Sequence, residues 1–157
     1  GIRYLAGDDT RVVVGNDEEN EDINTDEYEA IEDIKNKIGV EVPEFYYRPQ
    51  GMKFYDYTIA ESTGAAYIEY QYRDTMIAFY IDKQNEYTAS NINIIKGEEN
   101  TIDTISEDGV KITIKEIRDK EEVPTCKAVW SKNEVSYSLI GKMEVEDLKK
   151  IVEYMKF

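Results

Sequence analysis

Tyrosine is the residue type with the greatest capacity for binding in this sequence, with 13 copies among 157 residues. Its large, rigid and amphipathic side chain is a common anchor at protein interfaces. Tyrosine also suits the half-buried surface of a β-sheet, so the same residues have a purely structural explanation. Both explanations can be correct if other parts of the protein leave one face of the sheet uncovered. We therefore predict a partner- or ligand-binding surface made from Tyr46, Tyr47, Tyr55, Tyr57, Tyr70 and Tyr72.

The carboxylates are the second group that could perform chemistry, but no pair stands out among 34 acidic residues. Asp17, Glu19 and Glu21 alternate as calcium ligands often do. The glycine of a calcium loop is absent, however, and Tyr28 occupies the position of the bidentate glutamate. We therefore favour a solvated acidic loop and keep calcium binding as the alternative.

Several residue types needed for catalysis are absent or isolated. There is no histidine, which removes the commonest general base and metal ligand. Cys126 is the single cysteine, and we expect a small buried side chain in a strand. No serine-nucleophile motif, phosphate-binding loop or dinucleotide fingerprint is present. The prediction is a protein without catalytic residues, metal or cofactor. A hydrolase with two convergent carboxylates is kept as an alternative.

The net charge of −15 limits the possible partners. Such a surface repels the nucleic-acid backbone and anionic lipid headgroups, so we predict no nucleic-acid partner. No apolar run is long enough to cross a bilayer. The chain begins with Gly1 instead of methionine, and we interpret this as the end left by removal of a tag. We expect that the missing upstream segment contained a membrane anchor or signal.

Two helices are predicted at the two ends of the chain. After a hairpin over 2–16 and an acidic loop, a helix is expected over 25–38, with Asn24 and Glu27 as a capping box. A second helix is expected from Glu144, and its apolar stripe is Val145, Leu148, Val152 and Met155.

Strands are predicted for most of the remaining chain because apolar residues there recur with a period of two. The expected strands cover residues 52–60, 65–72, 75–82, 90–96, 100–106, 110–118, 126–132 and 135–141. Short turns between them indicate antiparallel neighbours. Gly141 is expected to let the chain turn from the last strand into the last helix. We predict one α+β domain over residues 1–157, with a sheet covered by helices on one face.

Four segments together resemble a known family: KIGVEVPEF, YRPQGMKFYDY, GAAYIEYQYRDTMIAFYI and AVWSKNEVSYSLIGKMEVEDLKKIVEYM. The chain resembles the domain of unknown function 4367 family over residues 25–157. Members of this family are often the extracytoplasmic half of membrane-anchored, anti-sigma-factor-like proteins of Gram-positive bacteria. The Tyr-x-Leu-x-Gly strand of the family is similar to Tyr137, Leu139 and Gly141. Its connector proline and glycine are similar to Pro49 and Gly51.

The resemblance implies a lipoprotein-carrier-like fold, a strongly curved antiparallel sheet of about eight strands with two helices against it. It implies no catalytic residues. We therefore expect a non-enzymatic extracytoplasmic domain for sensing or protein interaction, tethered to the membrane by an upstream segment. Its partner would be an unknown protein. The alternative is binding or carriage of an apolar, lipid-like ligand in the concave face of the sheet.

Overall fold

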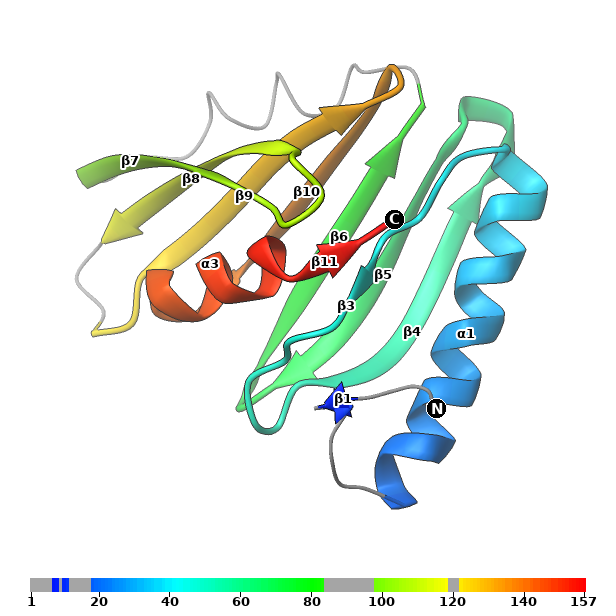
Figure 1. Cartoon of the computed structure of the whole chain (residues 1–157), viewed down its shortest axis with the longest axis horizontal. Helices are drawn as coiled ribbons and strands as arrows, with labels where there is room; N and C mark the ends of the chain where they lie inside the picture. The colour runs from blue at the N-terminus through cyan, green and yellow to red at the C-terminus, as the bar shows by residue number, and fades with distance from the viewer. Residues whose placement is uncertain (1–6, 9, 12–17, 84–97, 119–121) are drawn as a thin grey trace.

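The computed structural model describes residues 7–8, 10–11, 18–83, 98–118 and 122–157, with side chains over 26–83, 100–118 and 122–157. Seven strands of this part of the chain form one open antiparallel sheet (Figure 1). In chain order they are β4 (Lys53–Ala60), β5 (Ala65–Tyr72), β6 (Thr75–Asp82), β7 (Glu98–Ile105), β8 (Lys111–Arg118), β9 (Thr125–Lys132) and β10 (Val135–Lys142). The α+β prediction is confirmed. The strand expected over 90–96 lies outside the described residues.

The sheet consists of two meanders that meet at one strand pair. Its strand order is β4-β5-β6-β10-β9-β8-β7, so each meander joins neighbours in sequence. The meanders meet where β6 pairs with β10, with Phe79 opposite Leu139. Asn133 and Glu134 both have positive φ, as a two-residue hairpin turn between β9 and β10 requires. Along β4 the register shifts between Phe54 and Asp56, which is a β-bulge.

Helix α1 (Glu18–Ile38) is longer than predicted at its start. Its end at Ile38 is confirmed, where Gly39 follows in the left-handed conformation at φ +77°. The predicted loop over the acidic tract was wrong from Glu18 onward, because acidic residues stabilise the first turns of a helix. Asn24 and Glu27 are therefore interior helical residues, and the predicted capping box does not form.

Both helices pack on the same face of the sheet, which we call the covered face (Figure 1). Helix α1 lies along β4 and β5 and buries Ile31 and Ile34 there. Helix α3 (Val145–Glu153) lies against β7, β8 and β9 and buries Leu148, Ile151 and Val152. The predicted stripe of the last helix is thereby confirmed for Leu148 and Val152.

A two-stranded ribbon lies on the covered face between the two helices (Figure 1). Strand β3 (Glu44–Phe45) pairs with β11 (Met155–Lys156), so the end of the chain meets the connector after α1. Phe45 and Met155 point inward and are buried. This ribbon was not predicted, and Met155 belongs to it instead of to the last helix. The other short elements are β1 (Gly7–Asp8), β2 (Thr10–Arg11) and the 3₁₀-helix η1 (Glu61–Thr63).

Aromatic rings fill the centre of the core beneath the ribbon. Trp130 stacks on Tyr137 with ring centroids 5.7 Å apart, and both stack on Phe79. The ring of Phe45 meets Phe79 edge-on at 5.0 Å. Such contacts stabilise the fold beyond the area that they bury. The prediction of Trp130 as a core residue is confirmed.

Gly141 has a different role from the predicted turn. Strand β10 continues through it to Lys142. A Cβ atom at position 141 would lie 2.9 Å from Cγ1 of Ile77 on β6. A side chain does not fit at this distance, so glycine allows β6 and β10 to pack closely at this point.

We predict that Leu148→Asp unfolds the domain, because it places an unpaired charge at a site with no solvent exposure. The expected loss is about 4 kcal/mol, which is a large part of the stability of a typical domain. Leu148→Met is the matched control, with an expected cost below about 1.5 kcal/mol. Thermal denaturation followed by circular dichroism measures both variants. An unchanged melting temperature for the aspartate variant would contradict this assignment of the core.

We also predict that Cys126 is unreactive in the folded protein. Its thiol is fully buried and donates a hydrogen bond to the carbonyl of Met143 at 3.2 Å. Burial raises the pKa of the Cys126 thiol to about 12. Because the thiolate is the reactive form, alkylation at mildly alkaline pH should be slow until denaturant is added. Mass spectrometry of the alkylated protein measures this, and rapid labelling without denaturant would refute it.

Candidate functional site

The structure divides the six predicted tyrosines among different environments. Tyr70 and Tyr72 are buried on the covered face of β5. Tyr46 and Tyr55 are exposed, whereas Tyr47 and Tyr57 are half-buried against the core. The six side chains therefore do not share one surface. Whether any of them binds a partner stays a prediction.

Tyr70 belongs to a buried polar cluster with Glu27 and Arg48. Arg48 donates two hydrogen bonds to the Glu27 carboxylate, at 2.6 and 2.7 Å. The Tyr70 hydroxyl donates to the same carboxylate at 2.8 Å. Arg48 also donates from Nε to the carbonyl of Phe45 at 3.0 Å. This cluster ties α1 and β5 to the ribbon, because Glu27 lies on α1, Tyr70 lies on β5, and Arg48 in the connector after β3 bonds to Phe45 of the ribbon.

The charges in this cluster are mutually compensated. Burial and the Glu27 charge raise the pKa of Tyr70 well above its ordinary value, so its hydroxyl stays a donor. Burial alone would lower the pKa of Arg48, but the Glu27 carboxylate outweighs it and the net pKa is raised. Tyr70 and Arg48 thus keep the protonation states that their hydrogen bonds require. Such a satisfied network orders this part of the structure.

Tyr57 makes a similar structural contact nearer the surface. Its hydroxyl donates to Asp33 on α1 at 2.9 Å. This hydrogen bond, followed by burial, raises the pKa of Tyr57. Tyr55 lies at the β-bulge of β4, and its side chain is exposed to solvent. Tyr57 therefore fastens α1 to the edge of the sheet.

The outer side of the ribbon is the strongest candidate for a binding surface. Tyr46 is 49% exposed and Tyr154 is 42% exposed, and they flank the paired strands at the same end. Lys156 lies over the ring of Tyr46 at 5.4 Å, and Lys150 lies over the ring of Tyr47 at 5.5 Å. We call these five residues the ribbon surface. Its aromatic groups are held on a rigid element, because Phe45 and Met155 anchor the ribbon in the core.

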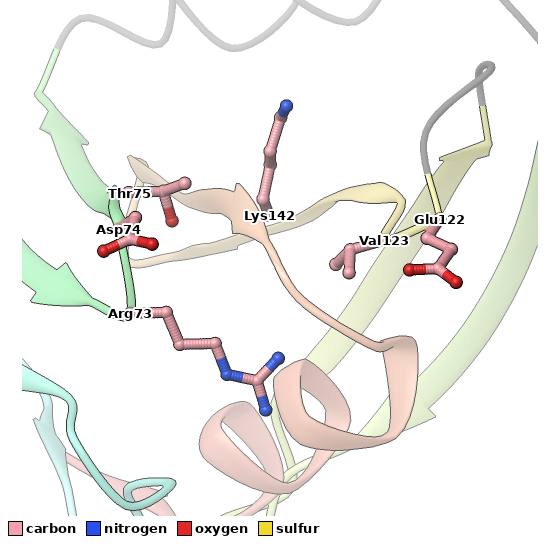
Figure 2. Close-up of a pocket in the computed structure, with 6 residues that line it drawn as sticks. All are labelled: Arg73, Asp74, Thr75, Glu122, Val123 and Lys142. Carbon is pink, nitrogen blue, oxygen red and sulfur yellow. The ribbon is translucent and has the colours of Figure 1, made fainter.

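An open hollow, separate from the ribbon surface, lies at one end of the sheet (Figure 2). It has a volume of about 300 Å³ and is lined by Arg73, Asp74, Thr75, Glu122, Val123 and Lys142. The side chains of Arg73 and Lys142 extend in different directions, as Figure 2 shows. Its two acids and two bases do not converge on one point. This hollow therefore lacks the geometry of a catalytic centre.

No cluster of metal-binding side chains occurs within the described ranges. The calcium alternative falls on the side chains of Asp17, Glu19 and Glu21, which lie outside those ranges. No helix among the described residues is long and apolar enough to cross a membrane.

Sequence reasoning missed Glu27, Arg48 and Tyr154. Glu27 was predicted as a helix-capping residue, and nothing in the sequence indicates its contact with the distant Arg48. Arg48 stands between Tyr47 and Pro49, and a base in such a connector has no periodic signal. Tyr154, Met155 and Lys156 alternate between exposed and buried positions in the structure, as strand residues do, but three residues are too few to show a period in the sequence.

A family model described as "Domain of unknown function (DUF4367)" matches residues 42–155. The match begins after α1, includes β3, all seven strands of the main sheet and α3, and ends at Met155, the first residue of β11. It confirms the resemblance drawn from the sequence, over a narrower range than 25–157. No curated protein and no solved structure matches the chain.

We predict that Glu27→Gln destabilises the domain by about 2–3 kcal/mol, because it leaves the Arg48 guanidinium without a buried counter-charge. Glu32→Gln is the matched control on the same helix, since Glu32 pairs with Lys35 in an exposed ion pair. The control should change stability by about 0.5 kcal/mol or less. Chemical denaturation measures both. Equal effects in the two variants would show that the buried cluster has no special role.

Proposed function

We propose, from the premise that the chain belongs to the DUF4367 family, that it is a non-enzymatic domain for protein interaction or sensing. In this proposal the domain lies outside the cytoplasm as part of a membrane-anchored regulator. The ribbon surface is the single observation that carries the proposal. It supplies exposed tyrosines, which are residues enriched at the energetic centres of protein interfaces.

The construction of the ribbon surface supports a role in recognition. Tyr46 and Tyr154 lose little side-chain entropy on binding, because tyrosine has few rotatable bonds. Lys150 and Lys156 lie over neighbouring rings and add positive charge to a chain with net charge −15. A partner with acidic groups around an apolar patch matches this arrangement. The buried polar cluster beneath the ribbon keeps the tyrosines in place.

The finer fold prediction, a strongly curved and lipoprotein-carrier-like sheet, is part of the same proposal. The alternative function, carriage of an apolar ligand in a concave face, stays a prediction. On the covered face the described core residues Phe79, Trp130 and Tyr137 stack directly on one another, and this favours interaction over carriage. Native mass spectrometry of the purified protein tests the alternative, since a carrier would retain lipid.

We predict that a photo-crosslinking amino acid at position 46 or 154 captures one protein partner when the full-length gene product is made in its own cells. Position 55 is the matched control, because Tyr55 is also an exposed tyrosine but lies at the bulge of β4. The expected result is one product of the same mass from positions 46 and 154 and none from position 55. Identical products from all three positions, or none at all, would overturn the assignment of the ribbon surface.

The cellular side of the domain is tested separately in intact cells. An external protease should remove an epitope placed at the C-terminus of the full-length protein if the domain lies outside the membrane. A cytoplasmic marker protein provides the control for cell integrity. Protection of the epitope in intact cells and its loss after lysis would contradict the extracytoplasmic placement.

A further inference from the structure

Strands β4 and β7 form the two outer edges of the sheet, and these edges are built differently (Figure 1). Along β4 the register shifts between Phe54 and Asp56. Along β7 eight consecutive residues, from Glu98 to Ile105, pair with β8 without any shift. Within the described part of the chain, β7 has no second neighbour in the sheet. Its outer backbone groups therefore form a straight and regular template for another strand.

The side chains of β7 also suit the addition of a strand. Ile102 packs against the core, so by alternation Thr101, Asp103 and Ile105 point to the opposite face of the sheet, which we call the far face. These three side chains are exposed, and Ile105 is 54% exposed. Threonine and isoleucine are β-branched and favour extended backbone. An added strand would cover Ile105 and extend the sheet with residues that already favour pairing.

Negative charge along this edge restricts the kind of strand that fits. Residues 98–108, which cover β7 and the turn after it, contain five acidic residues and no basic residue. Asp103 accepts a hydrogen bond from the Thr113 hydroxyl at 3.2 Å and has no ion pair in the described part of the structure. Lys111 and Lys115 lie on β8, one strand further from the edge. Asp103 is therefore the nearest far-face charge that an added strand would meet.

We propose that the outer edge of β7 binds an extended, basic segment of a partner protein by strand addition. Main-chain hydrogen bonds supply the affinity in this mode of recognition, and alternate side chains supply the specificity. A lysine or arginine of the segment would lie beside Asp103, and an apolar side chain would lie beside Ile105. A second copy of this chain fits less well, because two chains of net charge −15 repel each other. The site goes beyond the ribbon surface, since none of the five ribbon residues lies on β7.

The experiment titrates the purified, isotope-labelled protein with the synthetic peptide KVIVKVIVK, capped at both ends, at low and constant ionic strength. Saturable shifts are expected for the amide signals of residues 100–105, and no shifts are expected along β4. The peptide KVIPKPIVK has the same charge but lacks two backbone donors, so it should not bind at β7. The peptide EVIVEVIVE can pair but carries the opposite charge, and its binding should be weaker by about tenfold or more.

Variants of the protein test the two named side chains. Asp103→Asn keeps an acceptor for Thr113 and removes the charge, and should weaken binding of KVIVKVIVK by about threefold. Ile105→Thr keeps the β-branched shape and should weaken it by a similar factor. Asp56→Asn is the matched control, because Asp56 is an exposed aspartate on the other edge, and binding should be unchanged. All three variants change exposed residues and should melt close to the wild-type temperature.

The outcomes separate the proposed partner from other occupants of the edge. Absence of saturable binding of KVIVKVIVK, equal binding of the proline peptide, or equal losses in Asp103→Asn and Asp56→Asn would overturn the proposal. Sedimentation of the protein without peptide should show a monomer. A dimer that dissociates in Ile105→Thr would assign the edge to a second copy and contradict a basic partner. The crosslinking test at positions 46 and 154 concerns other residues, so failure of either proposal is distinguishable from failure of the other.

Discussion

The pairing of β6 with β10 is the interaction on which the rest of the structure depends. It joins two meanders that are otherwise local in sequence, and it connects residues more than fifty positions apart. Forming such a contact requires closure of a long loop before any pairing energy is gained. Gly141 allows this pair to pack closely, because a larger residue would collide with Ile77. Once the pair forms, both helices and the ribbon find a single continuous face on which to pack.

The local elements of this fold could be predicted from the sequence, and their long-range partners could not. Strands β5 and β6 match the predicted 65–72 and 75–82, since alternation and short turns are local signals. The ribbon escaped prediction because two-residue strands are too short to show a period. Glu27 was assigned to a helix cap, because its contact with Arg48 joins distant segments and leaves no trace in spacing.

For the candidate sites, too, composition indicates which residue types could bind, but only the structure shows where they lie. The abundance of tyrosine directs attention to Tyr46 and Tyr47, but composition does not separate exposed rings from the buried Tyr70. Tyr154 attracts no notice in the sequence, because it directly follows the apolar stripe of the last helix. Its place beside Tyr46 arises only when β3 pairs with β11. Sites made by neighbouring strands therefore require the sheet order before they can be found.

The β-bulge in β4 has a consequence for how the domain behaves at high concentration. Strand β4 is one outer edge of the sheet, where unpaired backbone groups can recruit a strand from another molecule. The bulge between Phe54 and Asp56 interrupts the regular spacing of those groups, and Lys53 and Asp56 add exposed charge beside it. A bent and charged edge is a poor template for edge-to-edge association. This irregularity therefore protects the open sheet from aggregation while leaving its covered face intact.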